Sequence, residues 1–146
     1  MKKAIILLLF AFGFVFGEPI AFEYLPVYPT GDPGPEYYGF PFIYRTDTTW
    51  VSSLSGILYL KGLIANLLFW AIISFLASRG IDKLRGKPKI ASQIVAIVFG
   101  IYLVLVAFLK VSINDWSIQY DHDNMKMDYY NEELDYHREI IWFQNR

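Results

Sequence analysis

The chain has 146 residues, of which 55% are hydrophobic and 18% aromatic, and its formal net charge is −1. The apolar residues are gathered into long runs instead of alternating with polar ones, so a single soluble domain with half-buried helices or strands is not expected. The absence of cysteine excludes disulfides and thiolate metal sites, and the sequence offers no basic surface suited to nucleic acid.

Residues 1–17 form a short apolar segment with a basic start. Two lysines precede the apolar run Ala4–Phe16, and Gly17 offers a small residue at a cleavage position before Glu18. This pattern is typical of a secretory signal peptide, which is shorter than a spanning helix. We favour cleavage after Gly17; the alternative is an uncleaved signal anchor that continues through Pro19–Phe22. Both interpretations leave the amino terminus in the cytoplasm and place Glu18 outside.

Residues 18–56 combine prolines with aromatic residues and are expected outside the membrane. Six of the seven prolines lie in this segment, and proline excludes long helices and central strands. We therefore expect irregular structure with short extended pieces at Ala21–Val27 and Phe42–Arg45. The string Tyr37–Arg45 is interpreted either as an aromatic belt at the outer headgroups or as a recognition surface, and the belt is favoured. The belt would continue through Trp50, Tyr59, Tyr102 and Trp116.

Two long apolar runs predict a helical hairpin that crosses the membrane twice. The first span is expected over residues 57–78 and the second over residues 90–110, and ~20 helical residues match a hydrocarbon core of ~30 Å. Residues 79–89 between them carry five Lys or Arg against one Asp. The excess of positive charge places this loop in the cytoplasm and both flanking segments outside. Gly80 and Pro88 are interpreted as the stop and start signals of the two helices.

Small and polar residues of the two spans predict how they pack. Ala96-x-x-x-Gly100, continuing to Ala107, is a seam at which the two helices would approach each other closely. Asn66 and Gln93 are expected to form hydrogen bonds between the helices. The alternative is a polar path for an ion or proton, which we do not favour because neither span has an acidic residue or a histidine in its interior.

The string Gly39-Phe40-Pro41-Phe42 is followed by an apolar segment that contains Asn66-x-x-Phe69-Trp70. Over Tyr38–Ala77, this arrangement resembles small bacterial membrane proteins that have no assigned function. The resemblance implies a bacterial-type integral membrane protein and carries no activity or site residue.

Residues 111–146 form a polar, aromatic tail for which two structures compete. Strict alternation over residues 116–120 and 125–129, with a four-residue turn between them, predicts a β-hairpin. A second pattern, with apolar residues three or four apart, predicts a helix instead. We favour the hairpin, followed by a helix that runs from Asn131 to Phe143.

The tail also holds a cluster of ionisable residues. The cluster lacks the spacing of a calcium loop or of a zinc-binding histidine pair, so we interpret it as a turn with a solvated acidic face. Its members are Asp121, His122, Asp123, Asp128, Glu132, Glu133, His137 and Glu139.

These patterns predict a mainly α membrane protein: a two-helix transmembrane hairpin after a signal peptide or signal anchor, with small irregular or β extracytoplasmic segments. No catalytic residue, cofactor or metal ligand is indicated, and we do not expect an enzyme. The favoured function is an accessory, structural or interaction subunit in the inner membrane of a bacterium. It would contact the lipid bilayer, and a protein partner or a second copy, through its helices and aromatic outer segments. The alternative is an extracytoplasmic sensor or binding module whose acidic tail binds a cation.

Overall fold

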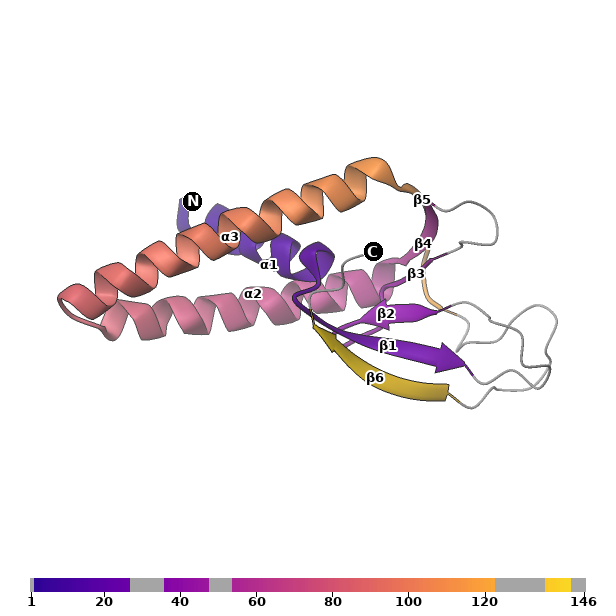
Figure 1. Cartoon of the computed structure of the whole chain (residues 1–146), viewed down its shortest axis with the longest axis horizontal. Coiled ribbons are helices and arrows are strands. Elements are labelled where there is room, and N and C mark those ends of the chain that lie inside the picture. The colour runs from indigo at the N-terminus through magenta and orange to yellow at the C-terminus, as the bar shows by residue number, and fades with distance from the viewer. Residues whose placement is uncertain (1, 27–35, 48–53, 123–135, 143–146) are drawn as a thin grey trace.

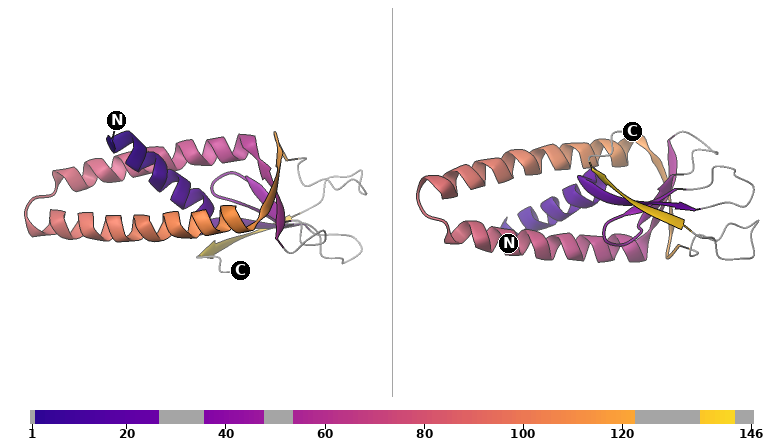
Figure 2. Two further views of the ribbon diagram at one scale, coloured as in Figure 1. Left: turned by 90° about the horizontal axis from the view of Figure 1, so that it is seen from above. Right: turned by 60° about the horizontal axis from the view of Figure 1, so that its bottom comes forward.

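The computed structural model describes residues 2–26, 36–47, 54–122 and 136–142, which form three helices and a six-stranded mixed sheet (Figure 1). The helices are α1 (Lys2–Gly17), α2 (Leu60–Lys83) and α3 (Lys87–Ile113). The strands are β1 (Ile20–Pro26), β2 (Tyr37–Gly39), β3 (Arg45–Asp47), β4 (Ser55–Tyr59), β5 (Asp115–Gln119) and β6 (Tyr136–Trp142). The helices extend to one side of the sheet, so the molecule is elongated (Figures 1 and 2).

The sheet has the strand order β5-β4-β3-β2-β1-β6. All neighbouring strands are antiparallel except β4 and β5, which are parallel. The ladder between β1 and β6 begins with Ile20 opposite Trp142 and joins the segment after α1 to the tail. Of the extended pieces predicted from the sequence, Ala21–Val27 corresponds to β1 as far as Pro26, and Val27 lies outside the described residues. The piece predicted at Phe42–Arg45 is wrong in position, because β3 begins at Arg45.

Strands β4 and β5 adjoin the ends of α2 and α3 that lie away from their connecting loop. β4 leads directly into α2 at Leu60, and β5 begins at Asp115, two residues after the end of α3. The strands run parallel, with Ser55 opposite Asp115 at the first step. The four residue steps of this ladder span about 13 Å at ~3.3 Å per residue, so the start of α2 and the end of α3 lie at least this far apart. Directly packed helices lie about 8–10 Å apart, so α2 and α3 meet at their connecting loop and spread apart toward the sheet (Figure 1).

Helix α1 packs against both α2 and α3 and crosses the space between them (Figures 1 and 2). Gly13 and Gly17 lie one turn apart and both face Leu103 of α3; a β-carbon on them would lie 3.0 Å and 3.2 Å from the Leu103 side chain. On α2, the ring of Trp70 stacks on Phe14 with ring centroids 4.4 Å apart. The glycines let the backbones of α1 and α3 approach closely, as small residues do between membrane helices.

The seam predicted between the two long helices serves α1 instead. Gly100 is buried, and a β-carbon there would overlap the ring of Phe10 in α1. Ala107 is buried in the core cluster that contains Ala11 of α1. The prediction that Ala96, Gly100 and Ala107 pair the two long helices directly is therefore wrong, because α1 occupies the place that the second long helix was expected to take.

The two long apolar helices expected from the sequence are confirmed, with different bounds. The first was expected over residues 57–78, but Ile57–Tyr59 belong to β4 and α2 begins at Leu60. α2 then continues through Gly80 to Lys83, so Gly80 is not a stop signal. A glycine inside a helix costs only about 1 kcal/mol relative to alanine, which the rest of a long helix offsets.

The second long helix is longer than residues 90–110. It begins at Lys87 with Pro88 in its first turn, where proline is well tolerated because that turn has no helical acceptor for its N–H groups. Residues 84–86 alone connect α2 to α3. The loop predicted over residues 79–89 is therefore wrong in extent, although its basic residues remain gathered at this end of the hairpin.

Three tyrosines of the string that begins at Tyr37 belong to the protein core, whereas Phe42 is exposed. Tyr37, Tyr38 and Tyr44 are all buried, so they form neither a belt at the headgroups nor an open recognition surface. Tyr44 packs edge-on against Phe16 of α1, with ring centroids 5.8 Å apart. These rings therefore join α1 to the sheet.

The other residues assigned to the aromatic belt differ in their surroundings. Tyr59 is buried in the sheet, and Trp116 packs against Gly56 of the neighbouring strand. Tyr102 is exposed on α3. Trp50 lies outside the described residues.

The tail contributes strands to opposite edges of the sheet. The strand predicted over residues 116–120 is present as β5, but its neighbour is β4, and residues 125–129 lie outside the described part of the chain. The helix predicted from Asn131 to Phe143 is wrong over residues 136–142, which form β6. Pairing with β1 supplies the backbone hydrogen bonds of this segment and overrides its local preference.

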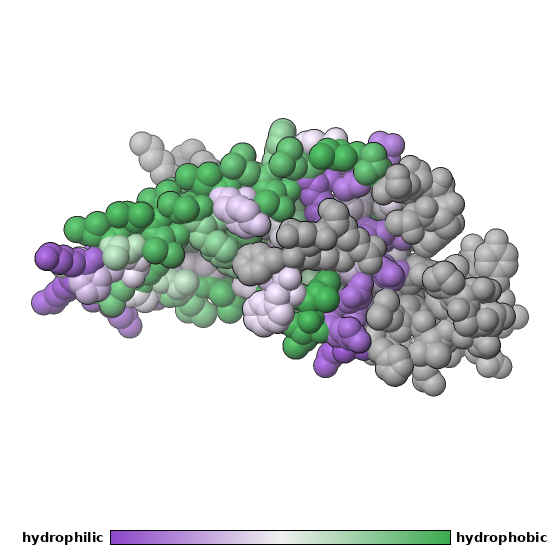
Figure 3. Space-filling view, in the orientation of Figure 1, coloured by the Kyte–Doolittle hydropathy of each residue, from purple (hydrophilic) through white to green (hydrophobic). Residues whose placement is uncertain are grey.

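The helices carry most of the exposed apolar surface of the molecule. Figure 3 shows a hydrophobic zone over them, with hydrophilic residues at the connecting loop and where the helices approach the sheet. α2 and α3 are long and apolar enough to cross a bilayer, and only 17% of the apolar window of each is buried within the protein. The exposed side chains include Ile6, Leu9, Ile64, Leu68, Ile72, Ile94, Val98, Ile101, Leu105 and Phe108.

Candidate functional site

A buried ionic cluster lies where α1 and α3 meet the sheet. Glu18 directly follows α1, and its side chain and that of Arg45 at the start of β3 are each 2% exposed. Arg45 Nε donates to Glu18 Oε1 at 2.7 Å and Arg45 Nη2 donates to Glu18 Oε2 at 2.9 Å. Lys110 in the last turn of α3 also donates to Glu18 Oε2, and the Tyr44 hydroxyl lies 2.6 Å from Oε1. We call Glu18, Tyr44, Arg45 and Lys110 the junction cluster.

The backbone of Glu18 explains how its side chain enters the protein. Its φ is +43°, in the left-handed region, which costs a non-glycine residue about 1–2 kcal/mol. This turn ends α1 and leads into β1 within two residues. A bidentate bond between a carboxylate and a guanidinium is among the stronger polar contacts in proteins, so the junction cluster offsets the strain of this conformation.

The guanidinium of Arg45 is enclosed by further contacts. Its Nη1 donates to Asp47, and its Cζ lies 4.2 Å from the centroid of the Tyr38 ring. The cationic group thus has two carboxylates beside it and an aromatic face below it. These contacts supply the partners that a buried charge requires.

The charges in the junction cluster fix its protonation. Burial by itself would raise the pKa of Glu18, but the positive charges of Arg45 and Lys110 and their hydrogen bonds lower it to about 2. Burial, together with the charge of Glu18, raises the pKa of Tyr44 well above its usual value of 10. Glu18 is therefore ionised and Tyr44 neutral at physiological pH. Such groups are poorly matched to proton transfer near neutral pH, and the arrangement fits a structural joint between helices and sheet.

A second joint holds residues 39–43 against the start of α2. The Asn66 side chain accepts a hydrogen bond from the Phe42 N–H at 3.0 Å and donates to the Phe42 carbonyl at 2.7 Å. A β-carbon on Gly62, one turn earlier in α2, would overlap the Ile43 carbonyl. The prediction that Asn66 bonds between helices is therefore wrong; it binds the loop that precedes β3.

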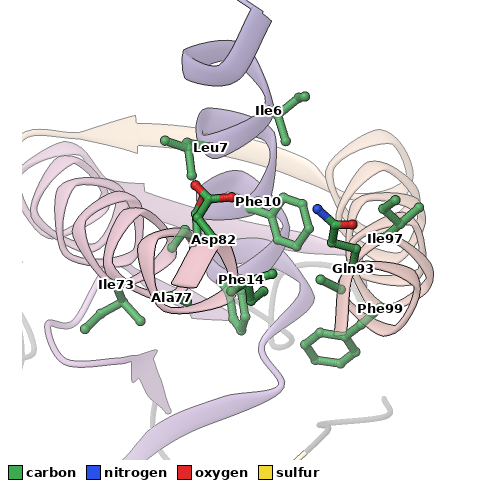
Figure 4. Close-up of a pocket in the computed structure, with 14 residues that line it drawn as sticks. Ile6, Leu7, Phe10, Phe14, Ile73, Ala77, Asp82, Gln93, Ile97 and Phe99 are labelled. Atoms are coloured by element: carbon green, nitrogen blue, oxygen red, sulfur yellow. The ribbon is translucent and has the colours of Figure 1, made fainter. Parts of the chain in front are cut away.

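A cavity of about 560 Å³ lies between α1, α2 and α3, on the side of the connecting loop (Figure 4). Its walls are mainly apolar, and the rings of Phe10, Phe14 and Phe99 form part of them. Asp82 of α2 and Gln93 of α3 point into the space beside Phe10 (Figure 4). Gln93 thus lies in the cavity wall, where the sequence predicted an interhelical hydrogen bond. The polar residues of the lining are Ser74, Ser78, Asp82 and Gln93.

The ionisable cluster predicted in the tail is divided between the two edges of the sheet. Asp121 and His122 follow β5, whereas Glu139 lies in β6 at the other edge. Asp121 pairs with Lys61 in the first turn of α2, and the hydrogen bond and charge of Lys61 lower the pKa of Asp121. Asp123, Asp128, Glu132 and Glu133, and the side chain of His137, lie outside what the structure describes. Within the described residues, no group of three or more His, Cys, Asp or Glu could hold a metal ion.

Sequence reasoning missed the junction cluster and the packing role of α1. Glu18 follows the first apolar run, Arg45 is the single base of residues 18–56, and Lys110 ends the last apolar run. Isolated charges that border apolar runs were a usable signal, because each needs a partner when buried. The Gly13-x-x-x-Gly17 spacing was another, since it is a helix-packing motif in an apolar segment.

The chain matches no protein-family model, no curated protein and no solved structure. Its function is therefore inferred from the residues and the geometry described above.

Proposed function

We propose that this chain is a small integral membrane protein that acts as an accessory or interaction subunit. Its three helices anchor it, and its sheet is displayed on the extracytoplasmic side. The observation that carries this proposal is the apolar side chains exposed along all three helices. Apolar side chains exposed along the length of three helices form a continuous patch, and such a patch indicates a lipid or protein environment.

The dimensions of the helices support insertion. α2 has 24 residues and α3 has 27, which at 1.5 Å per residue give about 36 Å and 40 Å. Both exceed the ~30 Å hydrocarbon core. Arg79, Lys83, Arg85, Lys87 and Lys89 lie at the loop end of the hairpin, which favours a cytoplasmic loop and an external sheet.

The packing of α1 favours an uncleaved anchor over a signal peptide. Cleavage after Gly17 would remove the ring that stacks on Trp70 and the glycines that face Leu103. It would also place a new amino terminus on Glu18, inside the junction cluster. We therefore propose that α1 stays attached as a third membrane helix, with its lysines toward the cytoplasm.

The accessory role follows from what the outer sheet offers to a partner. β5 and β6 each have one neighbouring strand in the described part of the sheet, and such edges can pair with a strand of another protein. Large apolar side chains are exposed near both edges, namely Ile118, Tyr120, Ile140 and Trp142. The junction cluster holds this sheet at the end of the helices, as an interaction module requires.

Single-cysteine labelling tests the membrane topology, because the chain contains no cysteine of its own. A membrane-impermeant maleimide added to intact cells should label Ser117→Cys in β5 and should not label Lys87→Cys until the membrane is permeabilised. Both residues are exposed, so the variants are matched in access. Labelling of Lys87→Cys in intact cells, or recovery of the chain in the soluble fraction, would refute the membrane proposal.

Site-specific photo-crosslinking tests the accessory role. A photoreactive residue at Ile118 should give one discrete protein adduct, whereas the same residue at Leu105, exposed on α3, serves as the control that reports contacts within the bilayer. An inserted chain that gives no adduct at Ile118 or Trp142, and that purifies as a monomer without a partner, would contradict this role.

A further inference from the structure

The cavity between the helices has the position of a lipid site. If α2 lies along the membrane normal, its cavity-lining residues run from Ile73 to Asp82, next to the helix end at Lys83. Ten residue steps from Ile73 to Lys83 rise about 15 Å. That is half of the ~30 Å hydrocarbon core. The cavity therefore covers the depth of one leaflet, the leaflet on the side of the connecting loop.

The size of the cavity restricts its occupant. At about 560 Å³ it falls within the range of small-molecule sites. A lipid acyl chain suits a site of this size and apolar lining.

The polar groups of the cavity are arranged along one wall. Ser74, Ser78 and Asp82 line it at intervals of four residues and so lie on one face of α2. The Ser74 hydroxyl oxygen is buried and has no hydrogen-bond partner among the residues that the structure describes. An unsatisfied buried hydroxyl is costly. At the depth given above, Ser74 lies near the bilayer midplane, beyond the ester carbonyls of a lipid, whereas Ser78 lies one turn nearer the headgroups.

The charge beside the cavity favours an anionic headgroup. Residues 79–89 hold five basic residues and one acid, a net charge of +4. The acid is Asp82, whose carboxylate points into the cavity and opposes a phosphate there, so the phosphate belongs outside, beside the bases. Basic residues on the cytoplasmic side of membrane helices are known features of anionic lipid sites.

We propose that this cavity binds one anionic phospholipid of the cytoplasmic leaflet, with an acyl chain between α1, α2 and α3 and the phosphate beside the basic residues of 79–89. The inference rests on the membrane insertion proposed above. Bound lipid would fill the space that the three helices leave between them on the side of the connecting loop.

Native mass spectrometry of the full-length chain, delipidated in mild detergent, tests the proposal. Phosphatidylglycerol and phosphatidylcholine with identical acyl chains are added at equal concentration. We expect one phosphatidylglycerol per chain and a preference of about tenfold over phosphatidylcholine. Equal retention of the two lipids, or a dimer mass in place of the lipid adduct, would overturn the proposal without any variant.

Substitutions that fill the cavity test whether the lipid binds there. Ala96→Phe on α3 and Ala77→Phe on α2 each place a ring in the cavity from opposite walls and should remove the lipid adduct. Ala91→Phe, at an exposed position of α3 outside the lining, is the matched control and should retain it. Two filling variants are used so that one remains informative if the other fails to fold. Retention of phosphatidylglycerol by a folded filling variant at the level of the control would refute the assignment.

Charge variants test the headgroup contact separately. Replacing Arg85, Lys87 and Lys89 together with glutamine should bring retention of phosphatidylglycerol down to that of phosphatidylcholine while the latter is unchanged. An undiminished preference would exclude these bases from the site. If the chain inserts into membranes but shows no lipid preference, this inference fails and the proposed function stands; if the chain is soluble, both fail.

Discussion

The substitution Glu18→Gln tests whether the junction cluster holds the helices to the sheet. Glutamine keeps the shape of the side chain but removes its charge, so that Arg45, 2% exposed, and Lys110, 23% exposed, lose their shared counterion. Breaking a buried ion pair by removing one partner costs about 3–5 kcal/mol. The lowering of the Glu18 pKa from 4.5 to about 2 corresponds to roughly 3 kcal/mol, a similar magnitude. We therefore expect a loss of about 3 kcal/mol in the free energy of unfolding.

The measurement is unfolding of the full-length chain in mixed micelles by increasing fractions of a denaturing detergent, followed by tryptophan fluorescence. The double variant Glu18→Gln with Arg45→Met should lose less than the sum of the two single variants, because each single change already breaks the shared contact. Asp121→Asn breaks the exposed pair with Lys61 and should have little effect. Equal stability of wild type and Glu18→Gln would refute the structural role of the cluster.

Acid should weaken the same joint. The pKa of Glu18 is lower in the folded chain, so its contribution is complete above about pH 4.5, the unfolded value, and is lost as the pH falls toward 2. Wild-type unfolding curves should therefore move to lower denaturant between pH 4.5 and 2. Glu18→Gln should lack this part of the pH dependence. A profile that is the same in both proteins would mean that another group controls acid stability.

Three further predictions concern the second joint, between residues 39–43 and α2, and the retention of α1. Asn66→Leu removes the hydrogen bonds that Asn66 forms with the Phe42 N–H and carbonyl and should lower the free energy of unfolding by about 2 kcal/mol, measured by the same unfolding assay. Unchanged stability would show that Asn66 does not hold this loop. Gly62→Ala should destabilise by forcing the Ile43 carbonyl away, whereas Gly80→Ala, with open space around its added methyl group, should be neutral or stabilise by up to about 1 kcal/mol; similar effects at both positions would contradict the docked loop. The mass of the intact protein purified from membranes should include α1, and a mature chain that begins at Glu18 would show that α1 is removed.

The long helices were predictable because their signal is local. A run of about twenty apolar residues identifies a helix of this kind without reference to any other part of the chain. Their ends were not predictable to the same degree. Ile57 is apolar like the helix that follows it, and its inclusion in β4 depends on Thr46, its neighbour in the ladder between β3 and β4.

The sheet was largely beyond local prediction. β4 pairs with β5 across the whole helical hairpin, and β1 pairs with β6 across more than a hundred residues of the chain. Segments this short have little intrinsic preference for strand over helix, and the strands they pair with determine their conformation. The segment 136–142 illustrates this, because its helical interpretation used only neighbouring residues, while its strand conformation follows from the free edge of β1.

The character of α1 depends on a choice that local pattern alone does not make. A basic start and thirteen apolar residues are typical of a signal peptide, but they also fit a short anchor. What separates the two is whether the segment has a fixed place in the folded protein. The spacing of Gly13 and Gly17 supplies that place, because it matches the close approach of α1 to Leu103.

The junction cluster also explains how one arrangement of helices and sheet is selected. If the helices lie in lipid as proposed, apolar contacts between them discriminate little among alternative packings, because lipid tails are as apolar as leucine. A buried carboxylate is more demanding, since Glu18 must meet donors from β3 and α3 at once. A shift of α1 by one turn, about 5.4 Å, would leave Glu18 and Arg45 without each other. The few charges that border the apolar runs therefore determine how the helices hold the sheet, while the apolar runs determine only that long helices form.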